Sequence, residues 1–340
     1  MKSISEIKEL LALCDNPANI SVDLMAFFLY LKEMKRVKKR GNFKAFAIST
    51  NEIDLLHELI EHMIEYCKSD LKFQIAISKW DGSEQLNHWS FLEFNFRRIT
   101  SRPTLDILIC DPLGFDQSLV LTSLLSSKMK FGILSEGCTL KVYIPTDILQ
   151  IKGRICAYFV TDSISMLSNQ ESYCPIYDYM DSHQQQEKIR AAIDTLNEFR
   201  MSMACCYMED ELNSMYQFNL VVSSLPVRLL RTKQSTSDLE REVRDSEFRD
   251  AIVNSKEETA WESIDRNLFF VRDRLDQEQY RNMRVNKKME KVVGAASETS
   301  SLLSSSEDVQ QINEGIQRHR ISGLEKLIKQ DSDQCHLSYS

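Results

Sequence analysis

Short strand-like runs alternate with helical patterns between residues 43 and 156, and this alternation constrains the fold more than any other feature of the chain. Helical periodicity fills the intervals at 52–67 and 115–131, while the runs between them are rich in β-branched and aromatic residues. Strands and helices mixed in this way predict an α+β unit, with a small sheet packed on helices. The predicted strands are 43–49, 71–77, 90–96, 104–110 and 139–145.

Four polar residues occur in the order His, Asp, Gln, Cys at the ends of these predicted elements. His88 precedes one strand, Asp111 closes the next, Gln150 follows the last of them, and Cys156 opens a helical pattern. A cysteine thiol is mostly protonated at neutral pH, so a nucleophilic cysteine needs a nearby base, which is usually histidine. We interpret this ordered set as a thiol-nucleophile site.

Each of the other residues has a defined part in such a site. A carboxylate such as Asp111 can fix the orientation of the His88 ring. The side chain of Gln150, six residues before the cysteine, can donate a hydrogen bond where negative charge develops. A helix that starts at Cys156 directs backbone N–H groups and positive dipole at the thiol. The plain alternative is that Cys156 is only a small buried apolar residue.

Composition excludes several other classes of function. The net charge of −8 gives no general signal for nucleic-acid binding. The nine cysteines show no ligand-like spacing, so we expect no metal site and a reducing compartment. The longest apolar run, 24–31, is too short for a transmembrane segment. Residues 1–20 carry charges that interrupt any apolar stretch, and we expect a flexible segment without a secretory signal there.

The sequence also predicts the organisation that surrounds the site. A helix is expected at 21–40 and a methionine-rich one at 186–217. Apolar residues at coiled-coil spacing within 258–280 predict a helix that packs on the body or on one partner helix. We expect a flexible segment at 1–20, a core at 21–235, a helical insertion with a basic segment at 236–293, a linker at 294–308, a C-terminal helix at 309–330 and a disordered tail at 331–340.

Several short motifs resemble those of one family, the YopJ/AvrA effectors of clan CE. His88-Trp89-Ser90 resembles the family's His-x-Ser, and Asp111-Pro112 its carboxylate-Pro. The chain departs from the family where Asp111 replaces the usual Glu and where Arg231-Thr232 replaces a Lys-His pair. Further similar stretches are 45–77, 147–150, 156–159, 225–235, 285–288 and 318–321.

The resemblance implies a papain-like catalytic core at 21–235 and a helical, basic, regulatory C-terminal region. It implies an acetyltransferase that moves acetyl from acetyl-CoA through a cysteine thioester to Ser, Thr or Lys of host signalling proteins such as kinases. It also implies inositol hexakisphosphate as an activator, export at residues 1–20, and action in the host cytoplasm after secretion by a bacterium. The residues expected to bind the phosphate groups of acetyl-CoA and inositol hexakisphosphate are Arg231, Lys233, Gln234, Ser235, Lys287, Lys288, Arg318, Arg320 and Lys326.

Two other functions remain open at the level of the sequence. The same clan contains ubiquitin-like proteases and deubiquitinases, whose acyl group goes to water, and the pairing of His88-Trp89 with Asp111 is common in them. A third hypothesis is a non-catalytic scaffold in which 236–284 binds a partner. The thioester chemistry is common to the first two, so the catalytic residues alone do not separate them.

Overall fold

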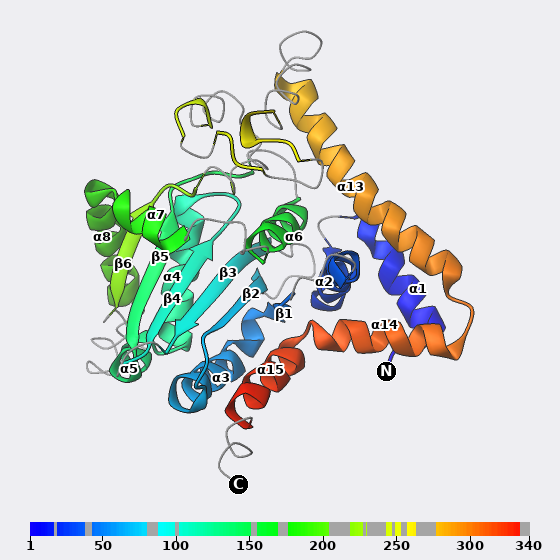
Figure 1. The fold of residues 1–340 in the computed structure, drawn as a ribbon, viewed down its shortest axis with the longest axis horizontal. Helices are drawn as coiled ribbons and strands as arrows, with labels where there is room; N and C mark the ends of the chain where they lie inside the picture. The colour runs from blue at the N-terminus through cyan, green and yellow to red at the C-terminus, as the bar shows by residue number, and fades with distance from the viewer. Residues whose placement is uncertain are drawn as a thin grey trace.

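A six-stranded mixed sheet forms the centre of the molecule, with the strands in the order β1-β2-β3-β4-β5-β6 (Figure 1). β3 is antiparallel to both of its neighbours, and the remaining pairs are parallel. The strands are β1 Ala45–Ser49, β2 Leu71–Lys79, β3 His88–Arg97, β4 Thr104–Cys110, β5 Thr139–Pro145 and β6 Asn219–Ser223. The structure is a computed structural model that describes residues 1–16, 19–37, 43–79, 88–98, 102–150, 155–168, 176–203, 218–226, 229, 243–246, 249–252, 257–262 and 277–333.

Helices cover both faces of this sheet, and the buried apolar residues form one core on each face (Figure 1). Along β3, Trp89 and Phe91 enter one core while Leu92 and Phe94 enter the other, because successive side chains of a strand point to opposite faces. The α+β fold with a small mixed sheet packed on helices is therefore confirmed. The helices are α1 Ile4–Ala12, α2 Val22–Val37, α3 Ile53–Tyr66, α4 Phe115–Lys128, α5 Phe131–Gly137, α6 Cys156–Leu167, α7 Ile176–Ser182, α8 Gln186–Met203, α13 Gln277–Leu302, α14 Ser306–Arg318 and α15 Ile321–Asp333.

The five predicted strands are all present, and the sixth, β6, was not predicted. β6 is only five residues long and pairs in parallel with β5. The helix predicted at 186–217 is α8, which ends at Met203, and positions 204–217 lie outside the described residues. Most of the predicted partner-binding helix at 258–280 and most of the tail at 331–340 also lie outside them. In the part of the chain that is described, no helix is both long and apolar enough to cross a membrane.

The expectation of a flexible segment at 1–20 is wrong for α1. Ser3 and Glu6 form a capping box, in which the Ser3 Oγ accepts from the Glu6 N–H at 3.3 Å and the Glu6 carboxylate accepts from the Ser3 N–H at 2.7 Å. Ile7 and Leu11, one turn apart, are both buried, and the helix packs against α13 and α14. The capping sequence Ser-x-x-Glu at 3–6 was the signal that could have predicted this helix.

The linker expected at 294–308 is also wrong, because α13 continues to Leu302 and α14 begins at Ser306. The small polar residues that suggested a linker bond back to the helix, as in the 2.8 Å bond from Thr299 Oγ1 to the Ala295 carbonyl. Ala296 is buried in the core, which fixes this part of α13. Packing thus overrides a composition that is typical of loops.

The single C-terminal helix expected at 309–330 is two helices, α14 and α15, separated at His319 and Arg320. There the chain pairs with the edge of the sheet, where the Ala47 N–H donates to the His319 carbonyl at 2.7 Å. Gly323 permits the turn, since a Cβ at this position would lie 1.9 Å from the Arg318 carbonyl oxygen. α15 then packs on α3 and β1, so the end of the chain is part of the folded body.

Candidate active site

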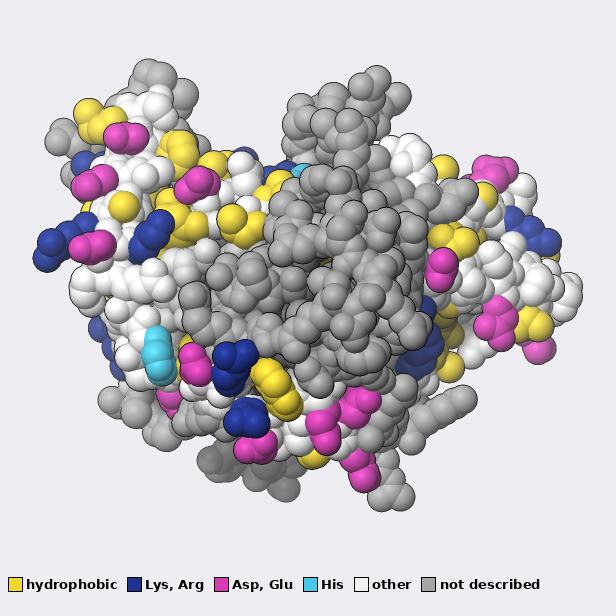
Figure 2. All heavy atoms as spheres, turned by 90° about the horizontal axis from the view of Figure 1, so that it is seen from above, with side chains coloured by type: hydrophobic (Ala, Val, Ile, Leu, Met, Phe, Trp, Pro, Cys, Tyr) yellow, Lys and Arg dark blue, Asp and Glu magenta, His cyan; other side chains and the backbone are white. Residues whose placement is uncertain are grey.

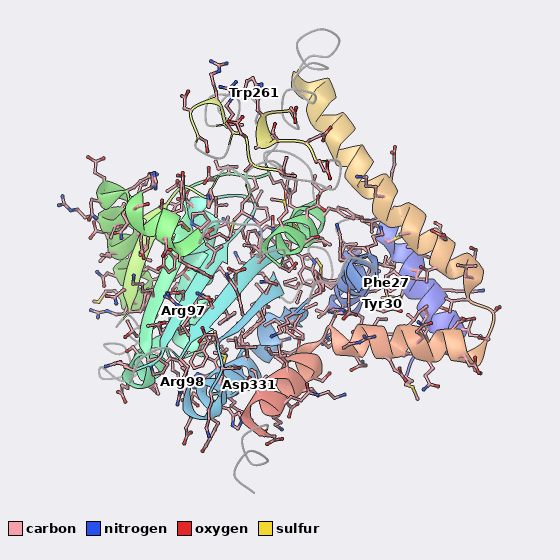
Figure 3. The ribbon with its side chains drawn as sticks, in the orientation of Figure 1. Phe27, Tyr30, Arg97, Arg98, Trp261 and Asp331 are labelled. Atoms are coloured by element: carbon pink, nitrogen blue, oxygen red, sulfur yellow. The ribbon has the colours of Figure 1, made fainter. Side chains whose placement is uncertain are left out.

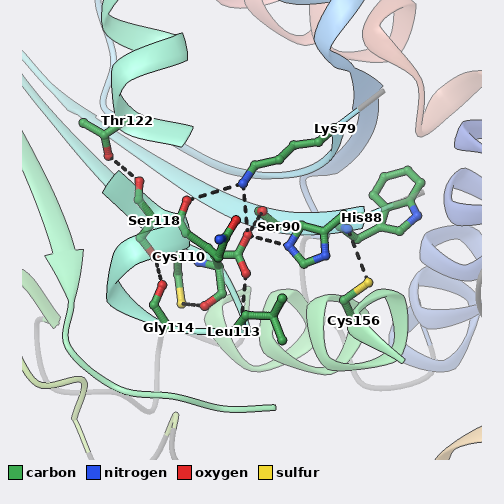
Figure 4. A network of polar contacts seen from close by, with 12 residues as sticks. Lys79, His88, Ser90, Cys110, Leu113, Gly114, Ser118, Thr122 and Cys156 are labelled. Atoms are coloured by element: carbon green, nitrogen blue, oxygen red, sulfur yellow. Dashed lines mark hydrogen bonds and ion pairs between the residues drawn. The ribbon is translucent and has the colours of Figure 1, made fainter. Parts of the chain in front are cut away.

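The three central residues of the predicted site meet where β3 begins, β4 ends and α6 begins (Figure 4). The antiparallel register pairs Phe91 with Cys110, so the next pair places Ser90 opposite Asp111. α6 packs against β3, which brings its first residue, Cys156, to the head of that strand. The structure therefore joins side chains that are up to 68 positions apart in sequence, from His88 to Cys156.

Asp111 is fully buried and holds the imidazole of His88. The His88 Nε2 lies 2.6 Å from the Asp111 Oδ2, and the Ser90 hydroxyl donates to the same oxygen at 2.7 Å. The Leu113 N–H donates to the other carboxylate oxygen at 2.9 Å. Burial raises the pKa of Asp111, but the hydrogen bond and positive charge of His88, followed by the charge of Lys79, outweigh burial and hold it below its ordinary value. Asp111 is therefore an ionised, orienting carboxylate.

Cys156 and His88, the predicted reactive pair, interact with each other in the structure. The Trp89 N–H points at the Cys156 Sγ, 3.4 Å away, and the side chain of Cys156 also interacts with His88. Burial lowers the pKa of His88, but its hydrogen bonds to Asp111 and Cys156 and their negative charges raise it to about 9. His88 is then an imidazolium at neutral pH. Because Nε2 bonds to Asp111, Nδ1 is the ring nitrogen that faces the sulfur.

Three other described cysteines lie in environments that disfavour the thiolate. Burial raises the pKa of Cys138 to about 12, and that of Cys67 to about 12 as well. The Cys110 thiol, next to Asp111, has its pKa raised well above the ordinary value by burial and then by the charge of that carboxylate. Thiols of this kind are inert, so these three cysteines are poor candidates, and Cys156 stays the predicted nucleophile.

Two neighbours of Asp111 were not assigned a role from the sequence. Ser90 lies two residues after His88, and alternation along the strand places both on the same face. Lys79 ends β2 as the cross-strand partner of His88, and its Nζ lies 3.4 Å from the Asp111 Oδ2. The spacing of Ser90 could have been read from the sequence. The position of Lys79 depends on the register between two strands and could not.

Gln150 is buried beside the loop that carries the carboxylate. The backbone N–H of Gln150 donates to the Pro112 carbonyl at 2.7 Å, and the backbone N–H of Leu149 donates to the same oxygen at 2.9 Å. Gly114 has φ +107°, a region that favours glycine, and a Cβ there would lie 2.7 Å from the Ile148 side chain. The two loops are thus in close contact, while 151–154 lie outside the described residues. A role of Gln150 as an oxyanion donor stays a prediction.

Replacement of Gln150 by alanine tests that prediction. If its amide donates to the developing oxyanion, Gln150→Ala should cost about 3 kcal/mol of transition-state stabilisation, which is roughly a hundredfold fall in the acylation rate. Single-turnover acylation of Cys156 by a thioester measures this rate directly. Gln185→Ala, which changes a glutamine bonded to Thr146 instead, is the control. An unchanged rate for Gln150→Ala would remove it from the site.

The predicted phosphate-binding residues are only partly described. Arg231, Lys233, Gln234 and Ser235 lie outside the described residues, as do the side chains of Lys287 and Lys288 on α13. Lys326 is exposed on α15. On the face shown in Figure 2, the basic side chains of the described residues are interspersed with acidic ones. The assignment of these residues to phosphate groups therefore remains a prediction.

Arg318 and Arg320 have carboxylate partners within the chain. Arg320 forms ion pairs with Asp23 and with Glu52, the latter at 2.9 Å. The Arg318 guanidinium lies 3.4 Å from Glu33 and 5.9 Å from the centre of the Tyr30 ring, which is on the side of α2 toward α14 (Figure 3). Both cations therefore have counter-ions within the folded chain, without a bound phosphate. Among the described residues, no cluster of His, Cys, Asp or Glu could hold a metal ion.

Comparison with solved structures finds similar chains. A deletion variant of AvrA with IP6 and CoA is 14% identical, with 86% of this chain and 99% of that chain covered and a TM-score of 0.45. HopZ1a in complex with IP6 is 13% identical, with 87% and 94% covered and a TM-score of 0.46. HopZ1a with IP6 and CoA is 16% identical, with 86% and 98% covered and a TM-score of 0.37. No family model and no curated protein matches the chain.

Proposed function

We propose that this protein is an effector acetyltransferase that carries the acetyl group on Cys156. The observation that supports this proposal best is the chain of contacts from the buried Asp111 to His88 and on to Cys156 at the start of α6. Such an arrangement is suited to acyl transfer through a thioester, because a nucleophilic cysteine needs a neighbouring base and a carboxylate that orients this base.

The two half-reactions follow from the positions of these groups. The Cys156 thiolate attacks the acetyl carbonyl of acetyl-CoA, the bond from that carbon to the CoA sulfur breaks, and CoA leaves with the proton of the His88 imidazolium. The neutral imidazole then accepts a proton from the hydroxyl or amine of the acceptor as this group attacks the thioester. The bond to Cys156 breaks, and the thiolate–imidazolium pair is restored.

The choice of donor, acceptor and activator rests on the sequence motifs shared with the YopJ/AvrA effectors. They favour acetyl-CoA as donor, Ser, Thr or Lys of host signalling proteins such as kinases as acceptor, and the host cytoplasm as the place of action. They also favour activation by inositol hexakisphosphate, whose phosphates would be bound by clustered Arg and Lys. The residues that we expect to contribute most to binding of inositol hexakisphosphate are Arg231, Lys233, Lys287 and Lys288.

Incubation with labelled acetyl-CoA, with and without inositol hexakisphosphate, tests the proposal. We expect incorporation of label into the protein, stronger with the polyanion, and a rise in the unfolding temperature when the polyanion binds the folded state. Replacing Lys287 and Lys288 with glutamate should weaken the activation and the thermal shift together. Lys329→Glu, which reverses a surface cation that pairs with Glu325, is the matched control.

Absence of incorporation in the presence of the polyanion would overturn the acetyltransferase proposal. A ubiquitin-like substrate with a C-terminal electrophile then distinguishes the remaining classes. Capture of that substrate by Cys156 would assign the site to a ubiquitin-like protease. Lack of reaction with both reagents, together with partner binding that survives Cys156→Ala, would assign the protein to the non-catalytic scaffolds.

A further inference from the structure

We propose that Lys79 is a positioning residue of this site, whose ammonium group holds Asp111 in place and supplies the second positive charge that the reactive thiolate requires. The inference rests on the proposed thiol chemistry at Cys156, and it holds for any acyl donor. Lys79 belongs to β2, a strand that contributes nothing else to the predicted set of catalytic residues.

The position of Lys79 is set by the strand register and by two oxygen acceptors. It is the cross-strand partner of His88 at the last pair between β2 and β3. Its Nζ donates to the Asp111 Oδ2 and to the Gln117 carbonyl of α4, both at 3.4 Å. The side chain is 19% exposed, so the charge lies mostly out of water and acts strongly on its neighbours. A lysine aimed at solvent would show none of these contacts.

The charges around Lys79 indicate why a second cation is useful. Asp111 after β4 is negative, and Cys156 on α6 is negative in its reactive form, while His88 on β3 supplies one positive charge. Lys79 makes the set neutral. Burial lowers the pKa of Lys79, while the charge and hydrogen bond of Asp111 and the charge of the Cys156 thiolate act in the opposite direction. Without Lys79, two negative charges would face one positive charge in a largely buried site, which disfavours the thiolate.

Among the described residues, no other lysine or arginine is bonded to Asp111. The other titratable groups near it are Cys110 and Asp147, and Asp147 acts on Cys110 as a negative charge. Asp147 itself accepts from the Leu225 N–H at 2.6 Å. Asp162, on the same helix as Cys156, is paired with Lys32 at 3.1 Å.

A purely structural role for Lys79 predicts a different behaviour. A lysine that only ties β2 to α4 and to the Asp111 loop would affect the unfolding temperature when replaced, but not the pH at which Cys156 becomes reactive. A lysine that supplies charge to the site would move this pH when the charge is removed, and a cation of another shape would restore it. The two roles are therefore separated by the pH profile of thiol reactivity.

The test measures the rate of Cys156 alkylation by iodoacetamide against pH, with peptide mass spectrometry to follow this cysteine alone. We expect the midpoint of the Lys79→Met profile to lie about one pH unit above that of the wild type, as for a unit charge removed from a partly buried pair. Lys79→Arg should restore the wild-type midpoint. Lys141→Met removes a lysine of β5 that is paired with Asp181, and this change should leave the midpoint where it is.

A folded Lys79→Met protein with an unchanged midpoint would overturn the proposal. If the methionine variant does not fold, Lys79→Gln removes the charge and keeps a donor for the Gln117 carbonyl, and the same shift is expected. A variant that loses acetyl transfer but keeps the wild-type pH profile of alkylation would also contradict the proposed role of Lys79. Alkylation does not require acetyl-CoA, so failure of the proposed acetyltransferase function leaves this result interpretable.

Discussion

Replacing Cys156 with alanine is expected to abolish formation of the acyl-enzyme while the free energy of unfolding changes by no more than about 1 kcal/mol. In the proposed mechanism the Cys156 sulfur is the attacking atom, and His88 and Asp111 lie beside it. The change removes a single buried atom at the start of α6, where Cys156 is 5% exposed. Intact mass after incubation with acetyl-CoA and chemical denaturation measure the two quantities.

The matched control for this variant is Cys138→Ala. Cys138 is also buried, and its thiol donates to the Leu134 carbonyl at 3.2 Å. Its raised pKa makes it inert, so the variant should lose some stability and keep its acylation. Acylation that survives in Cys156→Ala and disappears in Cys138→Ala would show that the nucleophile has been wrongly assigned.

The exchange of Asp111 for asparagine is expected to lower turnover by roughly 10³- to 10⁴-fold, the effect seen when an orienting carboxylate of a triad is lost. An amide at this position cannot balance the charges of His88 and Lys79, and it can hold the imidazole in the wrong orientation. Steady-state kinetics of acetyl transfer measure the effect. Asp106→Asn, a change to a buried carboxylate of β4 that pairs with Arg97 of β3, is the control. A near-native rate for Asp111→Asn would exclude Asp111 from the site.

The same variant should change how stability depends on pH. The folded protein raises the pKa of His88 from the model-compound value of 6.5 to about 9, so this contribution to stability is fully present below pH 6.5 and is lost as the pH rises through about 9. In Asp111→Asn the hydrogen bond and the charge that raise this pKa are removed. Denaturation at both ends of this interval should therefore show a smaller difference in the variant than in the wild type.

The proximity of His88, Asp111 and Cys156 could be predicted because each stands at the end of a regular element. Strand periodicity located the run that follows His88 and the one that Asp111 closes, and helical periodicity located the start of α6 at Cys156. The chemistry of thiol catalysis then selected residue types that the structure brings into contact. Local pattern and chemical requirement agreed at these three positions, so the prediction needed no knowledge of the sheet order.

Features that depend on contacts between distant parts of the chain could not be predicted in this way. Lys79 reaches Asp111 because of the register between β2 and β3. The sequence that joins these two strands does not predict this register. Arg320 pairs with Asp23, about 300 positions earlier, so its sequence context suggested a phosphate ligand instead. The helix through 294–302 shows the same limit, because its serine-rich composition indicated a linker before packing was known.

The most direct test of the central claim is the location of the acetyl group after a single turnover. The protein with inositol hexakisphosphate is mixed with labelled acetyl-CoA, quenched in acid, and digested for peptide mass spectrometry. The account predicts acetyl on the sulfur of Cys156 as a hydroxylamine-labile thioester, formed in wild type and strongly reduced in Asp111→Asn. Label that enters the protein without any thioester at Cys156, or equally in Cys156→Ala, would contradict it.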